Sequence, residues 1–164
     1  MAECCCAAAT DTLDEAPRCP VSGARTTPVD LRTVKALLTE TALARLSATA
    51  AHRFCADPSC DIVYVDAGGA RYLTSDLRVP VWQKARAGSE DRIICYCFGE
   101  SEARMRRELE ATGRSLATDR VRAHIAAGRC ACDLRNPRGA CCLGDLGAAI
   151  ARVTAASGAG HPRG

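Results

Sequence analysis

The 164-residue sequence has few large apolar residues, with only two Phe, one Trp, three Tyr and two Met. Although 48% of its residues are hydrophobic, 31 of these are alanine and 12 are cysteine. A chain of this length folds as one domain or two small ones, and small domains bury little apolar area to offset the loss of chain entropy. We therefore expect something besides apolar packing to stabilise the fold.

The sequence also lacks the motifs of several functional classes. It has no glycine-rich phosphate loop and no H-E-x-x-H motif, and its histidines, His52, His124 and His161, are far apart and have no paired nucleophile. The net charge is only +3, and neither half of the chain carries the basic field of a nucleic-acid-binding protein. We predict a protein that is not an enzyme and has no nucleic-acid partner.

No apolar run approaches the roughly 18 residues that a membrane span needs. The first three residues include an acid rather than a basic group, and the apolar stretch 4–9 is shorter than the core of a secretory signal. The sequence thus predicts a cytoplasmic protein without membrane insertion. In the reducing cytosol, cysteines are more often metal ligands than disulfide partners.

The predicted fold class is α+β, with a small β-rich subdomain followed by a helical one. A polar connector at 83–91, with Gly and Ser, marks the boundary between them. The organisation we predict is a flexible cysteine-containing tail at 1–18, the β-rich subdomain at 19–90, the helical subdomain at 91–156 and a disordered tail at 157–164.

Local patterns predict the elements within each subdomain. An interrupted helical stretch covers 34–46, a hairpin turns at Gly68 and Gly69 between strands at 61–66 and 70–73, and a further short strand lies at 77–81. In the second subdomain, we expect helices that Ser101 and Thr118 cap and a third from Leu143. The second and third of these helices flank a loop at 129–142, rich in Pro, Gly and Cys.

The late cysteines suggest an iron-sulfur cluster. Cys95 and Cys97 form a C-x-C pair, and two predicted helices separate them from four more cysteines, which are Cys130, Cys132, Cys141 and Cys142. A 2Fe-2S cluster needs four thiolates, and folding the two helices as a hairpin returns the loop to the C-x-C pair. A structural zinc site is the alternative, but zinc sites usually show C-x2-4-C on both sides.

These motifs resemble a known family. The segments CYCFG at 95–99, TG at 112–113 and C-x3-NPxGxCCLGD from Cys132 to Asp145 are similar to the N-terminal domain of CopZ-type copper chaperones. The first half is similar as well, in CPxxG at 19–23, VDLRTVKALL at 29–38, RFCADPSCDIVYV at 53–65 and DLRVPV at 76–81. The resemblance covers about residues 19–153. It implies a zinc-binding module followed by a 2Fe-2S module like that of the bacterioferritin-associated ferredoxin.

The resemblance also implies ligands. For the cluster these are Cys95, Cys97, Cys132 and one of Cys141 or Cys142, of which Cys142 is preferred because it opens a helix. Cys130 is then supernumerary. It is either a spare thiol or a residue with a role in ligand exchange or redox chemistry.

For zinc, the matching positions are Cys19, Cys55 and Cys60. Family members can show C-P-x-C at the start, whereas this chain has Ser22 at the last position of that motif. A neutral hydroxyl is a poor zinc ligand, so the fourth position stays open. The candidates for it are Asp57, Asp61, His52, a tail cysteine and water.

The function that we expect is metal handling, with copper or another soft metal as cargo and the cluster as a one-electron relay for a redox or metal-trafficking partner. One limit is that the sequence lacks the C-terminal heavy-metal-associated domain of CopZ-type chaperones. A ferredoxin-like module that docks a redox or iron-sulfur assembly partner is one alternative. Another is a mercury or copper resistance accessory protein that captures the ion with Cys4, Cys5 and Cys6.

Overall fold

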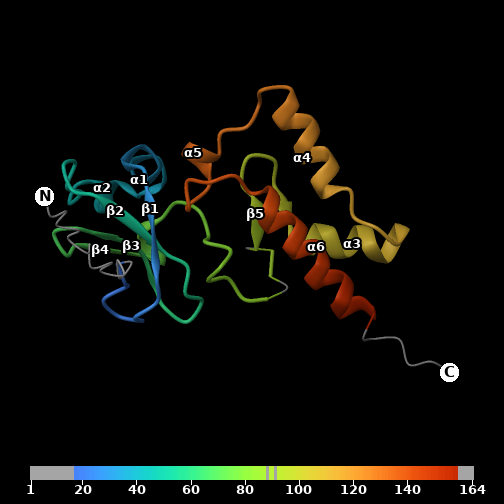
Figure 1. Ribbon diagram of the computed structural model, residues 1–164, viewed down its shortest axis with the longest axis horizontal. Helices are drawn as coiled ribbons and strands as arrows, with labels where there is room; N and C mark the ends of the chain where they lie inside the picture. Colours follow the sequence, from blue (N-terminus) through green and yellow to red (C-terminus); the bar gives the residue numbers. More distant parts are fainter. Residues whose placement is uncertain (1–16, 88, 91, 159–164) are drawn as a thin grey trace, which may run out of the picture.

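The computed structural model describes residues 17–158, except residues 88 and 91. Figure 1 shows an antiparallel sheet with short helices at one end and longer helices around a two-stranded hairpin at the other. The fold is therefore mixed α and β, which confirms the predicted class. Its described elements, in chain order, are β1 (Thr26–Val29), α1 (Leu31–Leu37), α2 (Glu40–Leu43), β2 (His52–Cys55), β3 (Ile62–Asp66), β4 (Arg71–Leu73), β5 (Ile93–Cys95), β6 (Glu100–Ser101), α3 (Glu102–Thr112), α4 (Ala117–Ala126), α5 (Cys132–Arg135) and α6 (Leu143–Gly158).

The first part is a four-stranded antiparallel sheet in the order β1-β2-β3-β4. Register places Phe54 opposite Tyr64 and Tyr64 opposite Tyr72, so these three aromatic rings share one face of the sheet. That face packs against α1 through Val34 and Leu38 and forms the larger core of this part. Cys55, adjacent to Phe54 in β2, belongs to a separate, smaller core on the opposite face.

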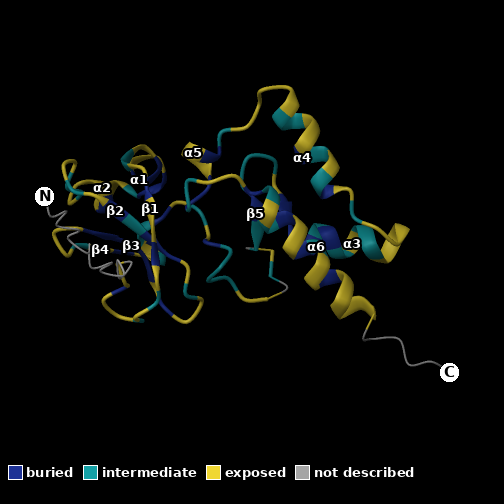
Figure 2. Ribbon diagram, viewed as in Figure 1, coloured by how far each residue is buried: buried dark blue, intermediate teal, exposed yellow. Residues whose placement is uncertain are grey.

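The second part surrounds the hairpin of β5 and β6. Ile94, Met105, Val121 and Leu146 are fully buried and come from β5, α3, α4 and α6 respectively. In Figure 2 the buried residues of these helices lie along their inner faces, while the outer faces are exposed. Four of the late cysteines belong to or pack against this core, so apolar packing holds the thiols in place.

The short helix α5 lies between the two parts and joins them (Figure 1). The buried Tyr64 hydroxyl donates a hydrogen bond to the Pro137 carbonyl at 2.8 Å, and the Thr33 hydroxyl donates to the Asp133 carbonyl at 2.6 Å. Gly139 has a φ of +67°, and a Cβ there would lie 3.0 Å from the Thr33 Oγ1. The cysteine-bearing loop is thus anchored on the sheet part, which couples the two parts mechanically.

Some local expectations differ from the structure. The strands β1 and β2 were not predicted, because their pairing is set by a distant strand and not by local alternation. The predicted strand at 77–81 is wrong, since Leu77 forms only an isolated bridge with Leu38. Pro80 lacks a backbone N–H and cannot extend that pairing.

One of the two predicted helix caps is present in the structure. Ser101 caps α3, accepting a hydrogen bond from the Arg104 N–H at 3.2 Å, as predicted. Thr118 does not cap α4, because the helix begins one residue earlier, at Ala117. Glu108 of α3 accepts from the Leu116 N–H and Ser115 from the Ala117 N–H, so a neighbouring helix supplies part of the cap.

The predicted tails are longer than the structure supports. The Pro17 carbonyl accepts hydrogen bonds from both the N–H and the hydroxyl of Thr26. The backbones of Arg18 and Arg25 form an isolated antiparallel β-bridge. At the other end, Ser157 and Gly158 complete the last turn of α6. The three tail cysteines, Cys4, Cys5 and Cys6, lie outside the described residues. Within the described part of the chain, no helix is both long and apolar enough to cross a membrane.

Candidate metal centres

Three buried thiols converge beside the sheet. The sulfur atoms of Cys19, Cys55 and Cys60 all lie within 4.8 Å of one another, and those of Cys19 and Cys60 are 3.8 Å apart. In a tetrahedral zinc site with Zn–S bonds of about 2.3 Å, two ligand sulfurs are separated by about 3.8 Å. The three thiols are therefore spaced for a common metal ion, and they are the residues that the sequence selected for zinc.

Hydrogen bonds lower the pKa of one of these three thiols. Burial raises the pKa of Cys19, but hydrogen bonds from the backbone and hydroxyl of Ser22 outweigh it and lower the pKa to about 7. Burial raises the pKa of Cys55, and a hydrogen bond from the backbone of Asp57 lowers it only in part. One thiolate is therefore accessible near neutral pH, and zinc binding must displace the remaining thiol protons.

A lysine closes the loop that carries Cys55 and Cys60. The Lys84 ammonium donates to the carbonyls of Asp57 and Cys60 at 2.8 and 2.7 Å. Three thiolates on one zinc ion would leave a net charge of −1. The Lys84 cation, held on the loop beside Cys60, would therefore stabilise the loaded site. Sequence analysis missed this role, because Lys84 lies in the polar connector and only the tertiary fold returns it to the loop.

The candidates for a fourth zinc ligand differ in their position relative to the three thiols. His52 is buried on the opposite face of the sheet from Cys55, with its ring 6.2 Å from that of Tyr72. The Asp57 carboxylate accepts hydrogen bonds from the N–H and hydroxyl of Ser59. The Ser22 hydroxyl instead lies 3.8 Å from the Cys55 sulfur. Ser22 therefore lies beside two of the three thiols, and Asp61 belongs to no group of close thiols among the described residues.

Replacing Ser22 with cysteine should strengthen zinc binding. The new thiolate would complete a four-cysteine site, and soft thiolates bind zinc better than a neutral hydroxyl. We expect the zinc affinity to rise by about tenfold or more, which corresponds to about 1.4 kcal/mol. Competition with a chromophoric chelator measures this, and Ser59→Cys is the matched control, because its exposed hydroxyl faces Asp57 and not the thiols. Equal gains in both variants would contradict this placement of Ser22.

A second set of thiols gathers in the helical part. The Cys97 and Cys132 sulfurs lie 3.9 Å apart, and the Ala131 N–H donates to the Cys97 sulfur at 3.4 Å. Cys95 and Cys142 form a second hydrogen-bonded pair, and both are almost fully buried. The Cys142 hydrogen bond lowers the pKa of Cys95 to about 7, while sharing that proton raises the pKa of Cys142. The four thiols therefore form two pairs, and two thiolates for each of two metals is the donor set that a 2Fe-2S cluster would need.

The two adjacent cysteines occupy different environments. Cys142 is 1% exposed and faces Cys95, whereas Cys141 is exposed and belongs to neither sulfur pair. Cys142 directly precedes α6, where the helix N-terminus favours a negatively charged group. The geometry therefore favours Cys142 as the fourth ligand. Cys130 is exposed as well, but its sulfur lies 3.3 Å from that of Cys132.

Two further features position the C-x-C segment. Tyr96 lies between Cys95 and Cys97 in the sequence. Its hydroxyl donates to the Pro80 carbonyl at 2.7 Å and accepts from the Trp82 N–H at 3.0 Å. Asn136 bridges its own turn, donating to the Ala140 carbonyl and accepting from the Arg138 N–H. The turn at 136–139 thereby holds the ends of the cysteine loop close together.

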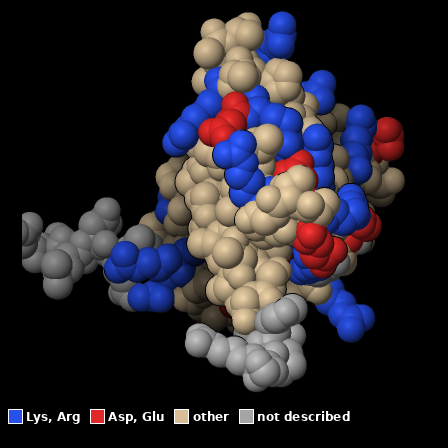
Figure 3. Space-filling view, turned by 90° about the vertical axis from the view of Figure 1, so that its right-hand side faces the viewer, with Lys and Arg blue, Asp and Glu red and all other residues tan. Residues whose placement is uncertain are grey.

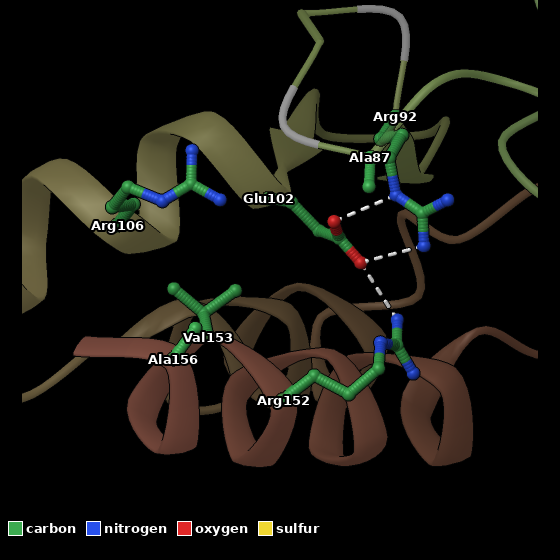
Figure 4. A pocket seen from close by; sticks show the side chains of 7 residues that line it. All are labelled: Ala87, Arg92, Glu102, Arg106, Arg152, Val153 and Ala156. Atoms are coloured by element: carbon green, nitrogen blue, oxygen red, sulfur yellow. Dashed lines mark hydrogen bonds and ion pairs between the residues drawn. The ribbon is translucent and has the colours of Figure 1, made fainter. Parts of the chain in front are cut away.

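A charged network braces the elements that carry Cys95 and Cys142. Figure 4 shows Glu102 at the start of α3 between Arg92, which precedes β5, and Arg152 of α6. Arg92 donates twice to the Glu102 carboxylate, at 2.6 and 2.9 Å, and Arg152 donates once, at 2.7 Å. Both guanidinium groups also lie over the Trp82 ring. The adjoining pocket of about 420 Å³ contains no thiol, so we assign this network a structural role.

Replacing Glu102 with Gln should destabilise the protein in a pH-dependent way. Burial raises the pKa of Glu102, but the hydrogen bonds from Arg92 and Arg152 outweigh it and hold the pKa below its usual value. A depressed carboxyl pKa stabilises the fold above the unfolded pKa, and this contribution is lost as the pH falls through the folded pKa. Breaking a buried ion pair costs about 3 kcal/mol, so the variant should lose about that much at pH 7.

Urea denaturation of the wild type and the variant at pH 7 and at pH 4 measures this loss. The difference between the two proteins should shrink at the lower pH, and loss of metal in acid affects both alike. Glu110→Gln on the exposed face of the same helix is the control and should change little. A difference that stays constant with pH would show that the Glu102 charge does not stabilise the fold.

Comparison with known proteins supports the zinc site. Residues 16–78 match the family model zf_CopZ, which is described as a zinc binding domain. This part of the chain is thus similar to CopZ-type zinc-binding domains, and it contains Cys19, Cys55 and Cys60. No curated protein matches the chain.

Among solved structures, the chain is similar to the X-ray structure of the Archaeoglobus fulgidus CopZ N-terminal domain, with a TM-score of 0.64 and 26% sequence identity. The match covers 80% of this chain and 96% of the other. It therefore extends beyond the zinc-binding domain into the helical part.

Proposed function

We propose that this protein binds one zinc ion and one 2Fe-2S cluster, and that it handles copper or another soft metal with the cluster as a one-electron relay. Zinc is held by Cys19, Cys55 and Cys60. The cluster is held by Cys95, Cys97, Cys132 and Cys142. The observation that carries the proposal is the arrangement of these last four thiols in two close pairs inside the helical core.

The zinc site has a structural role in this proposal. All three of its cysteines are buried, and they make up most of the small core on that face of the sheet. Zinc there replaces the apolar packing that the sequence lacks. The sheet part in turn anchors the cysteine loop through Tyr64 and Thr33, so zinc binding supports the shape of the second thiol set.

The cluster, when bound, supplies one electron at a time. The chain's own residues set its environment, because β5, α5 and α6 bury three of the four sulfurs, while Cys97 is partly exposed. The electron therefore has its shortest route to an incoming ion near Cys97. A reduced cluster held by these thiols would supply one electron to Cu(II), which would give Cu(I) and leave the cluster oxidised. We place this activity in the cytoplasm, where the thiols remain reduced.

Copper reduction tests the relay. The protein is reduced with dithionite, freed of excess reductant without oxygen and mixed with Cu(II) and a Cu(I)-specific dye. We expect about one more Cu(I) per cluster than the oxidised protein produces. The oxidised protein is the matched control, since its free thiols also reduce copper. Equal Cu(I) yields from both forms would contradict the relay role.

The charge of the helical end favours a second candidate, a ferredoxin-like module that docks an acidic redox partner. Residues 92–158 contain 11 arginines against 7 acidic residues. Figure 3 shows Lys and Arg side chains spread over this end of the molecule, with acidic groups among them. Binding that weakens with salt would support this candidate. The third candidate, capture of soft metals by Cys4, Cys5 and Cys6, rests on residues outside the described chain.

A further inference from the structure

Cys130 is an extra thiol beside the pair of Cys97 and Cys132 in the helical part. Cys130 is exposed, yet its sulfur lies 3.3 Å from that of Cys132. The sulfurs of Cys97, Cys130 and Cys132 all lie within 4.8 Å of one another. Three thiols therefore meet where the paired arrangement calls for two.

Cys130 differs in this respect from the other exposed thiol of the site. Cys141 is next to the buried Cys142 in sequence, but its sulfur belongs to no close thiol group in the described chain. Cys130 and Cys132 are separated only by Ala131, whose N–H donates to the Cys97 sulfur. The two cysteines thus form a second C-x-C pair that presents both sulfurs to the same side.

We propose that Cys130 is an alternative cluster ligand that exchanges with Cys132. This inference rests on the proposed cluster. In a loaded site, the Cys130 sulfur would replace the Cys132 sulfur as an iron ligand, and the proton of the Cys130 thiol would pass to the released Cys132 thiolate. No electron is transferred. The exchange moves one ligand from a buried to an exposed position and so opens one edge of the cluster to an incoming thiol or ion.

Ligand variants test the exchange through iron and sulfide content and through the EPR spectrum of the reduced cluster. Cys132→Ala should keep most of its cluster with a shifted spectrum, because Cys130 replaces the missing ligand. The double variant Cys130→Ala/Cys132→Ala should lose it. Cys141→Ala/Cys132→Ala is the matched control and should behave like Cys132→Ala. Zinc content reports whether the sheet part is still folded in each variant.

Alkylation gives a second readout of the same exchange. Iodoacetamide should label Cys130 in the wild type and fail to label it in Cys132→Ala, where iron protects the sulfur. If the wild type holds a cluster but Cys132→Ala loses it as completely as the double variant, the inference is wrong and the proposed function stands. If the wild type holds no cluster, the proposed function itself fails.

The rate of cluster loss gives a readout that does not depend on Cys132→Ala. Cys130→Ala should bind a full cluster with an unchanged spectrum. It should release that cluster to an iron chelator more slowly than the wild type, because the exposed ligand state is no longer accessible. Equal release rates in the two proteins would overturn the exchange.

Discussion

Replacing Cys142 with Ala should abolish the 2Fe-2S cluster, whereas replacing the adjacent Cys141 with Ala should leave it intact. Cys142 is 1% exposed and forms a hydrogen-bonded pair with Cys95, so its loss leaves one iron with a single protein thiolate. Cys141 is exposed and belongs to no group of three close thiols among the described residues. Iron and sulfide analysis of both variants, purified without oxygen, measures the effect.

The Cys141→Ala variant is also the control for folding and thiol number in this comparison. Both variants lose one thiol at neighbouring positions, so the contrast isolates position. Equal cluster loss in the two variants, or loss only with Cys141→Ala, would show that the structure assigns the wrong member of the pair.

Removing zinc should have the second large effect, which is loss of the ordered sheet. Structural zinc sites contribute about 10–16 kcal/mol of apparent binding free energy, and that energy is folding energy when the unfolded chain has no preformed site. Cys55 is fully buried, so Cys55→Ala removes a ligand and also opens the small core beside the sheet. We expect zinc content near zero, an early or non-cooperative melt and weaker cluster retention.

Circular dichroism during heating and metal analysis before it measure these changes. Cys141→Ala, which removes an exposed thiol far from the zinc-binding thiols in sequence, should melt like the wild type. A Cys55→Ala protein that melts cooperatively at the wild-type temperature would contradict a structural role for zinc.

Local signals in the sequence predicted the parts of the fold that depend on short-range chemistry. The Ser101 cap of α3 depends on a contact within a few residues, and it lies where the sequence placed it. The resemblance to the CopZ N-terminal domain also placed Cys19 with Cys55 and Cys60, and Cys97 with Cys132, and the structure brings the sulfurs of each set close together. C-x4-C closes a short loop, and the C-x-C pair needs only the return of one later loop.

The remaining features depend on long-range contacts, and no local pattern predicts these. His52, one of the candidates for the fourth zinc ligand, is 3% exposed, and its strand β2 pairs with both β1 and β3. Lys84 reaches the zinc loop, and Tyr96 reaches Pro80, only once the connector has folded back. The position of Cys130 beside Cys132 likewise depends on where α4 ends, which the sequence placed only approximately.

The account depends most directly on the metals that the protein binds. Iron, acid-labile sulfide and zinc can be measured on anaerobically purified wild-type protein, together with its EPR spectrum after dithionite reduction. The account predicts about two iron, two sulfide and one zinc per chain, with an EPR signal from one reduced 2Fe-2S cluster. A colourless protein that contains zinc but neither iron nor sulfide, and gives no EPR signal, would contradict it.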